Sequence, residues 1–174
     1  ALLGAAAFLV AGLVNWEDIN SGVNWGVVLL YGAAISLGIE MKETGAARWV
    51  AENFLSVLSP IGAGDGFGLW ASISVLTTAV TNTMSNGAAV AVLGPIVLKM
   101  ASVAGESPII IGFITAISSS FAYLTVVGTP ACTIVYASGY LKTTDFLAVG
   151  WKMALISTII MLIGARLYWP LLGV

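Results

Sequence analysis

The stretch GFGLWASISVLTTAVTNTMSNGAAVAVLGPIVL, residues 66–98, contains no charged side chain. It is much longer than the roughly 20 apolar residues that cross a bilayer once as a helix. Polar residues gather in its middle, in the segment TNTMSNG at residues 81–87. This pattern predicts two short helices joined by a turn at Ser85, Asn86 and Gly87, which together form a re-entrant hairpin in the membrane.

A second stretch without charges, residues 107–141, is organised in the same way. Its apolar residues are interrupted by SSS at 118–120 and by TVVGTP at 125–130, which predicts a helix broken near Gly128, Thr129 and Pro130. Unpaired backbone groups are costly in hydrocarbon, so a broken helix persists at membrane depth only where protein, water or a ligand satisfies them. Two interrupted helices in one apolar chain are typical of a transporter binding site.

The composition of the whole chain agrees with a membrane protein. Hydrophobic residues make up 59% and charged residues 8%, whereas about 25% of an average soluble domain is charged. The net charge of -2 gives no reason to expect a nucleic-acid partner. The single cysteine, Cys132, excludes an internal disulfide. The sequence therefore predicts an all-α integral membrane protein that crosses the bilayer several times.

The residues before the hairpin predict further membrane elements. Residues 1–14 have the composition of the end of a spanning helix, and residues 23–41 are long enough for another. Between them lies a polar loop that carries Trp16 and Asp18. Because the chain is apolar from its first residue and has no initiator methionine, we expect it to be part of a longer protein.

Residues 44–58 predict a different kind of helix. Apolar residues recur at helical spacing on one face, while Arg48 and Glu52 lie on the other. We expect Thr44 to cap this helix, Arg48 to pair with Glu52, and the helix to lie in the plane of the membrane interface. Residues 59–68, rich in glycine, predict a flexible joint, and residues 146–172 predict a final membrane span.

The residue types at the two breaks indicate what they bind. Hydroxyls, an asparagine amide oxygen and freed carbonyls are hard neutral oxygens that suit Na⁺, and the N-termini of the half-helices suit an anion. Between residues 66 and 141 the only carboxylate is Glu106, and the chain has no histidine. Proton-coupled carriers normally place such a group in the pathway, so the sequence favours sodium coupling.

At these residues the chain resembles the divalent anion:sodium symporter family, the carriers of dicarboxylates, tricarboxylates and sulfate. The second hairpin of that family carries a Ser-Asn-Thr signature and a run ending in Leu-Pro-Ile, and the corresponding stretch here is TNTMSNGAAVAVLGPI, residues 81–96. Its broken helix carries a Gly/Ala-Thr-Pro signature, here VGTPACTIVYASGYLK at 127–142. WEDI at 16–19 and WGVVLLYG at 25–32 are also similar to the family, so the resemblance extends over essentially the whole chain.

The resemblance implies an architecture and a function. It is to the C-terminal half of such a carrier, one of two inverted repeats, so the N-terminal half is expected as a missing partner. The implied activity is sodium-coupled transport of a divalent anion such as succinate, malate or sulfate, by an elevator-type homodimer in a cell membrane of the bacterial inner-membrane type. The implied parts are a scaffold segment at residues 1–62 and a transport segment at 63–174, the latter with a re-entrant hairpin at about 66–100, a broken helix at about 107–139 and a last membrane helix at about 144–172.

The resemblance also implies the site residues. Sodium would be coordinated by the side chains of Thr81 and Asn86 and by the carbonyls of Met84 and Gly128. The small anionic solute would be held on the substrate side by Ser85, Asn86, Gly87, Thr129 and Pro130. Gly87 departs from the family, because many members have threonine there. The substitution removes a hydroxyl that would bond a carboxylate and leaves a bare N–H.

Two alternatives remain open at this point. A sodium-independent or proton-coupled carrier of the same broad architecture, for anions or arsenite, would contain similar breaks, and the cation dependence of transport separates it from a symporter. The segment GAGD at 62–65 fits an intramembrane aspartyl protease, but such an enzyme needs a second aspartate, and neither Asp18 nor Asp145 follows a tyrosine. No phosphate-binding loop, zinc-ligand cluster or Gly-x-Ser-x-Gly segment occurs in the sequence, so we do not expect an enzyme.

Overall fold

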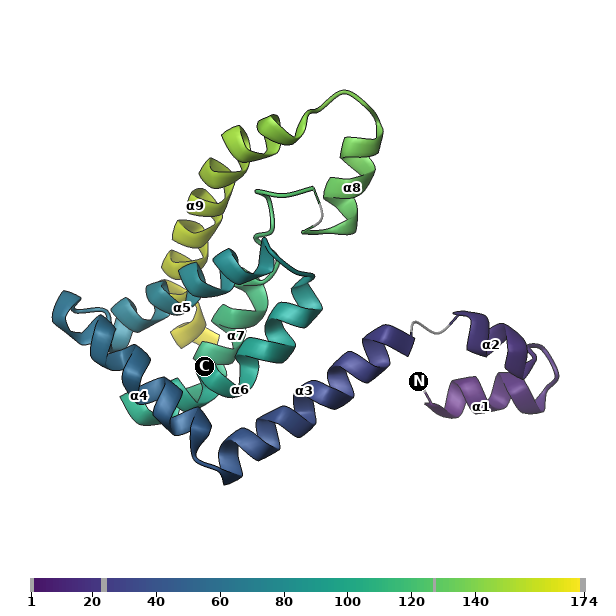
Figure 1. The fold of residues 1–174 in the computed structure, drawn as a ribbon, viewed down its shortest axis with the longest axis horizontal. Coiled ribbons are helices and arrows are strands. Elements are labelled where there is room, and N and C mark those ends of the chain that lie inside the picture. Colours follow the sequence, from purple (N-terminus) through teal and green to yellow (C-terminus); the bar gives the residue numbers. More distant parts are fainter. Residues whose placement is uncertain (1, 23–24, 127, 173–174) are drawn as a thin grey trace.

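The computed structural model describes residues 2–22, 25–126 and 128–172, and this part of the chain contains helices and no β-strand (Figure 1). The elements in chain order are α1 (Leu2–Val10), α2 (Trp16–Gly22), α3 (Trp25–Glu43), α4 (Ala46–Leu58), the 3-10 turn η1 (Ser59–Ile61), α5 (Gly66–Thr81), α6 (Asn86–Ala104), α7 (Pro108–Ser118), α8 (Pro130–Ala137), α9 (Thr143–Leu167) and the 3-10 turn η2 (Trp169–Leu172). The predicted all-α class is therefore confirmed for the described residues.

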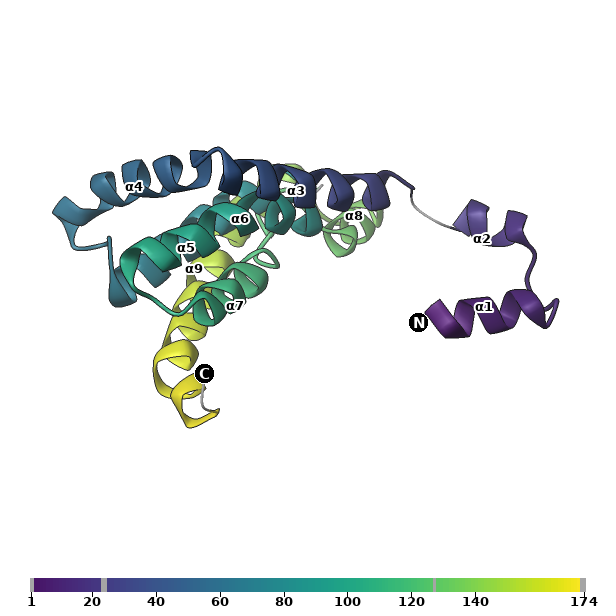
Figure 2. The same cartoon turned by 90° about the horizontal axis from the view of Figure 1, so that it is seen from below.

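The N-terminal helices α1 and α2 form an arm that extends away from the other helices at the far end of α3 (Figures 1 and 2). The segment before α3 was expected to be a polar loop, but it contains the helix α2. Its N-terminus is stabilised by Asp18, whose carboxylate accepts a hydrogen bond from the Asn15 N–H at 3.0 Å. One acidic side chain at the N-terminus is enough to favour a short helix in a polar segment.

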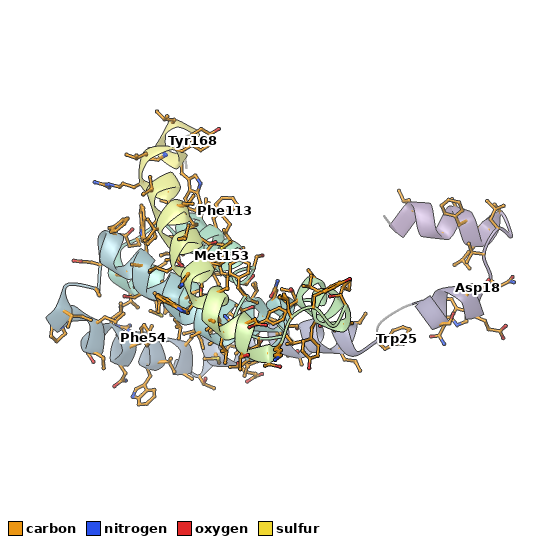
Figure 3. The ribbon with its side chains drawn as sticks, turned by 90° about the horizontal axis from the view of Figure 1, so that it is seen from above. Asp18, Trp25, Phe54, Phe113, Met153 and Tyr168 are labelled. Carbon is orange, nitrogen blue, oxygen red and sulfur yellow. The ribbon has the colours of Figure 1, made fainter. Side chains whose placement is uncertain are left out.

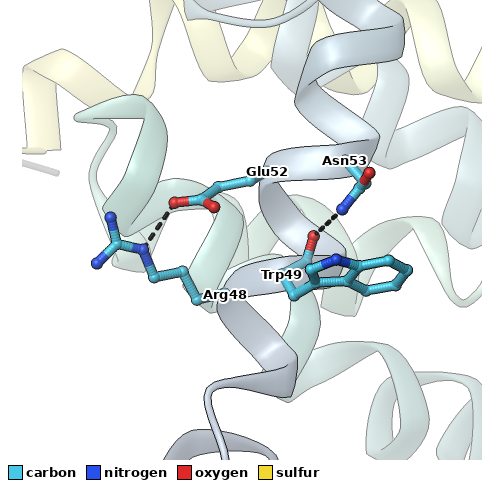
Figure 4. A network of polar contacts seen from close by, with 4 residues as sticks. All are labelled: Arg48, Trp49, Glu52 and Asn53. Carbon is cyan, nitrogen blue, oxygen red and sulfur yellow. Dashed lines mark hydrogen bonds and ion pairs between the residues drawn. The ribbon is translucent and has the colours of Figure 1, made fainter.

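The predicted amphipathic helix is present as α4. Ala47, Ala51 and Leu55 form its buried face, and on the exposed face Arg48 Nε donates to Glu52 Oε1 at 2.7 Å (Figure 4). The expectation that Thr44 caps the helix is wrong in detail, because the N-cap is Gly45 at φ 77°.

The turn from α3 into α4 explains this difference. A positive φ at Gly45 is a conformation that glycine adopts without steric cost. The Thr44 hydroxyl is engaged by the end of α3 instead, where it donates to the Glu40 carbonyl at 2.6 Å. It therefore makes only a long contact of 3.5 Å with the Ala46 N–H.

Two helices were predicted here, and α5 and α6 are present and pack against each other. The second is longer than predicted, at 19 residues, and the re-entrant arrangement stays a prediction. The two helices are joined by a turn at residues 82–85. This turn lies slightly earlier than expected, because Asn86 and Gly87 already belong to the first turn of α6. Ser85 is the N-cap, and its Oγ accepts a hydrogen bond from the Ala88 N–H at 3.4 Å. A serine at this position starts a helix at the next residue.

The helix interruption in the second stretch is longer than expected. The sequence placed it near residues 128–130, whereas α7 already ends at Ser118 and α8 begins at Pro130. Thr129 is the N-cap of α8, and its Oγ1 accepts a hydrogen bond from the Cys132 N–H at 3.2 Å. Proline at the first position of a helix costs no hydrogen bond, so Thr129 and Pro130 restart a helix rather than mark the only break.

The core lies between α4, α5, α6, α7 and α9. Its largest fully buried side chains include Leu69 and Ile73 on α5, Met100 on α6, and Ile111 and Ile114 on α7. Small residues are buried among them, which permits the close helix contacts that stabilise proteins in lipid. The buried alanines of the core are Ala51, Ala89, Ala101, Ala122, Ala154 and Ala165 together with Ala47.

The base of the hairpin is closed by Glu106, in the loop between α6 and α7. Its Oε1 accepts a hydrogen bond from the Gly66 N–H at 3.1 Å, and its Oε2 accepts one from Trp70 Nε1 at 3.0 Å. A carboxylate at the N-terminus of α5 also interacts favourably with the helix dipole. Glu106 therefore fixes the start of α5 to the start of α7.

Two helices in the described residues are long and apolar enough to cross a membrane by length and composition, Asn86–Ala104 and Thr143–Leu171. The second comprises α9 and most of η2, and in Figure 2 it leaves the other helices at a steep angle. Large apolar side chains on α9 are exposed, among them Leu147, Leu155, Ile160 and Ile163. An exposed apolar surface of this kind suits contact with lipid.

The close approach of α9 to the break between α7 and α8 gives a first prediction. A Cβ added at Gly150 would lie 2.7 Å from the carbonyl carbon of Tyr123 and 3.0 Å from the Cα of Leu124. Because backbone atoms cannot move aside easily, we expect Gly150→Ala to lower the free energy of unfolding by about 1–3 kcal/mol. The measurement is reversible unfolding of the purified protein in detergent.

Gly164 in the same helix is the matched control, because a Cβ there would meet nothing within 4 Å. Gly164→Ala should leave the stability unchanged or raise it by up to about 1 kcal/mol, since alanine favours a helix over glycine. Equal stability of the two variants would contradict the packing of α9 described here.

Candidate functional site

The side chain of Asn82, buried in the hairpin turn, connects the hairpin to the broken helix. Its Nδ2 donates to the Thr78 carbonyl at 2.7 Å and to the Phe121 carbonyl at 3.3 Å. Its Oδ1 accepts the Leu124 N–H at 2.8 Å, and its own carbonyl accepts the Thr125 hydroxyl at 2.9 Å. These contacts satisfy backbone groups that the interruption after α7 removes from a helix, so the turn and the break form one polar unit.

Next to Asn82, two oxygen atoms converge on the hydroxyl of Thr81, a fully buried residue at the end of α5. Thr81 Oγ1 lies 2.6 Å from the Ser119 carbonyl oxygen and 2.9 Å from Asn86 Oδ1. A hydroxyl has one proton to donate, and the shorter contact, with Ser119, is the stronger hydrogen bond. Asn86 Oδ1 is a second acceptor within reach of the same hydroxyl, so three neutral oxygen atoms meet here, the type of ligand that hard cations take.

The other residues predicted on the hairpin surround this cluster. Met84 lies in the turn, and Ser85 caps α6. The next two residues, Asn86 and Gly87, are the first of α6, where backbone N–H groups have no partner within the helix. The start of this long helix therefore combines N–H donors with the positive end of a helix dipole, which together favour a negative charge.

The predicted residues of the broken helix pack within their own segment. Gly128 is buried, and a Cβ there would lie 2.8 Å from the Ala122 Cβ and 3.0 Å from the Ala122 carbonyl oxygen. Thr129 caps α8, and Pro130 is its first residue. Among the described residues no hydrogen bond joins Gly128 or Thr129 to the hairpin turn. The structure thus brings Thr81 and Asn86 together and connects the break to the turn through Asn82.

Sequence reasoning missed Asn82, Ser119 and Thr125. Asn82 and Thr125 belong to the polar segments that the sequence singled out, and an asparagine inside a stretch without charges was a usable signal. Ser119 contributes through its backbone carbonyl, and no property of its side chain predicts that contact.

The aspartates of the protease hypothesis have other roles in the structure. Asp145 Oδ2 accepts the Lys142 N–H at 2.8 Å in a capping box at the start of α9. Asp18 caps α2, and Figure 3 shows it on the arm of α1 and α2, away from the main group of helices. Asp65 immediately precedes α5. Asp18 and Asp145, the two possible catalytic partners of Asp65, both act at the start of a helix instead. The geometry therefore gives no support to an aspartyl protease.

The bonds of Asn82 give the second prediction. We expect Asn82→Ala to lower the free energy of unfolding by about 2–3 kcal/mol, because each hydrogen bond contributes about 1 kcal/mol and the Leu124 N–H loses its partner. Asn53→Ala is the matched control, since Asn53 is exposed and its Nδ2 makes the same kind of bond to the carbonyl four residues earlier, that of Trp49 (Figure 4). The control should lose about 0.5 kcal/mol or less. Similar losses in denaturant titrations of both variants would refute the role given to Asn82.

Comparisons with known proteins bear on this site. The family model described as the sodium:sulfate symporter transmembrane region matches residues 1–174. An uncharacterized transporter of Haemophilus influenzae is 30% identical over 97% of this chain. The sodium-dependent high-affinity dicarboxylate transporter 3 of Caenorhabditis elegans is 31% identical over 82% of the chain, and the sodium-dependent dicarboxylate transporter SdcS of Staphylococcus aureus is 27% identical over 91%.

The chain spans 36%, 25% and 30% of the length of these three relatives, respectively. All three are named as transporters, which supports the expectation, at the level of the family, that the chain is not an enzyme. The match of the family model over residues 1–174 confirms the resemblance seen in the sequence. The chain belongs to the sodium:sulfate symporter family, a family of divalent anion:sodium symporters in membranes.

Proposed function

We propose that this chain supplies part of the binding site of a sodium-coupled carrier for divalent anions such as succinate, malate or sulfate. The observation that carries the proposal is the meeting of Thr81 Oγ1, Asn86 Oδ1 and the Ser119 carbonyl at 2.6–2.9 Å. The family and the printed names of the sodium-dependent relatives support it independently.

The sodium ion is held at the turn between α5 and α6. Thr81 donates its proton to Ser119 at 2.6 Å, and this leaves the lone pairs of Thr81 Oγ1 and Asn86 Oδ1 for the cation. The carbonyls of Met84 and Gly128 complete the coordination. All of these ligands are neutral oxygens, which favour an alkali cation over a proton because none of them titrates in the ordinary pH range.

The anionic solute is held beside the sodium ion. Ser85, Asn86 and Gly87 lie at the N-terminus of α6, and Thr129 and Pro130 lie at the N-terminus of α8. N–H donors and dipoles at both helix ends attract a dianion, and the bound cation adds to the attraction. Gly87 presents its N–H without a side chain, so the solute is recognised by backbone at a position where many members of the family have a hydroxyl.

The carrier moves the solute by an elevator mechanism. Residues 1–62 are the scaffold segment, and residues 63–174 are the transport segment that crosses the membrane with its cargo. Two observations support joint movement within the transport segment. Glu106 fixes α5 to the loop before α7, and Asn82 fixes the hairpin turn to the break, so the hairpin, α7 and the break are suited to moving together. The N-terminal repeat of the same carrier and a second copy complete the transporter in the cell membrane.

The third prediction tests the sodium site with Thr81→Val, which keeps the shape of the side chain and removes its hydroxyl oxygen. In proteoliposomes containing the full-length carrier, uptake of labelled succinate or sulfate should depend on an inward sodium gradient. Thr81→Val should raise the sodium concentration for half-maximal uptake about tenfold or more, because one oxygen bonded to a charge contributes about 1.5–3 kcal/mol.

Thr83→Val is the matched control, since Thr83 is exposed and its hydroxyl bonds only within its own turn, to the Val80 carbonyl at 2.8 Å. Its half-maximal sodium concentration should equal that of the unmodified carrier. Uptake that does not depend on sodium and is driven by a pH gradient would support the proton-coupled alternative. If both variants had the same half-maximal sodium concentration, Thr81 would not be a sodium ligand.

A further inference from the structure

A groove of about 700 Å³ lies between α3, α4 and α6, separate from the hairpin turn. Its sides are mostly apolar, with Ala34 and Ile35 from α3 and Ala91 and Leu98 from α6. At Gly38 the two helices approach so closely that an added Cβ would lie 2.9 Å from the Cγ of Pro95. The groove is therefore a mostly apolar hollow beside the contact between α3 and α6.

Basic side chains gather at one end of this groove. Lys42, Arg48 and Lys99 line it, three of the six lysines and arginines in the sequence. Lys42 and Lys99 each lie four residues beyond the contact of Gly38 with Pro95, and α3 and α6 run side by side in the same direction (Figure 1). Both lysines therefore lie at the same end.

The side chains that line this end of the groove carry only positive charge, while Glu40 and Glu43 lie near Lys42 on α3 outside the lining. No acidic side chain of the described residues is among those that line the groove. The nearby acid Glu52 pairs with Arg48 through Nε only (Figure 4), and the guanidinium has further N–H donors. The hydrogen bond with Glu52, and then its charge, raises the pKa of Arg48, although an arginine is protonated without this help.

We propose that this groove binds an anionic phospholipid of the bilayer, with an acyl chain along α3 and α6 and the phosphate at Lys42, Arg48 and Lys99. A free phosphate would leave the apolar walls of the groove without a partner. A neutral lipid would leave the three basic side chains at its end without an anionic partner. Basic pockets between membrane helices bind anionic head groups for this reason. The groove reaches the first turn of α4 at Ala47 and Arg48, and α4 is an amphipathic helix suited to the membrane interface, where lipid head groups are located.

The test measures lipid binding to the purified full-length carrier by native mass spectrometry. The probes are phosphatidylglycerol and phosphatidylcholine with identical acyl chains, and glycerol phosphate as a soluble competitor. We expect the carrier to retain phosphatidylglycerol selectively, and the variant K42Q/R48Q/K99Q to bind it about a hundredfold more weakly, since each of the three basic residues contributes about fivefold near a membrane surface.

The matched control is K142Q/K152Q/R166Q, which removes the other three basic residues of the chain and should retain phosphatidylglycerol. If the triple variant of the groove fails to fold, K99Q alone should weaken binding about fivefold. Equal loss in the groove and control variants would overturn the proposal. Equal retention of phosphatidylcholine would do so as well, and displacement by glycerol phosphate at the lipid's own concentration would identify a free phosphate site instead.

Discussion

The buried amide of Asn82 is the interaction on which the hairpin and the broken helix both depend. In an apolar surrounding the backbone groups freed after α7 need partners, and Asn82 supplies a donor to Phe121 and an acceptor to Leu124. In return, Thr125 donates to the carbonyl of Asn82 in the hairpin turn. Each irregular segment therefore provides the hydrogen bonds that the other lacks.

The oxygen cluster at Thr81 is a consequence of the same interruption. Ser119 has a carbonyl available to Thr81 because α7 ends one residue before it. Nearer the middle of α5, Ser74 and Ser118 share a buried hydrogen bond of 2.7 Å between their hydroxyls, which aligns α5 with α7 below the cluster. Hydrogen bonds between helices of this kind set the register of packing in a membrane, and that register positions Thr81 opposite Ser119.

Much of this arrangement could be predicted from the sequence, because two long stretches without charges, each interrupted by polar residues, allow few solutions in a bilayer. The helices α5, α6 and α7 and the amphipathic α4 belong to this part, whereas Thr81 and Asn86 were named only through the resemblance to the family. The extent of the break could not be predicted, since it depends on whether Asn82 reaches Phe121 and Leu124 across the fold. The helix α2 was not predicted, because the polar composition of its segment indicates a loop. The hydrogen bond of Asp18 with the Asn15 N–H stabilises a helix there instead.

Glu106 has a mechanical consequence for the hairpin. Its carboxylate holds Gly66 and Trp70 at the end of the hairpin opposite the turn, while Asn82 holds the turn to the broken helix. The hairpin is therefore anchored at both of its ends. Opening the turn alone would break the bonds of Asn82, whereas movement of the hairpin together with the break leaves both anchors intact.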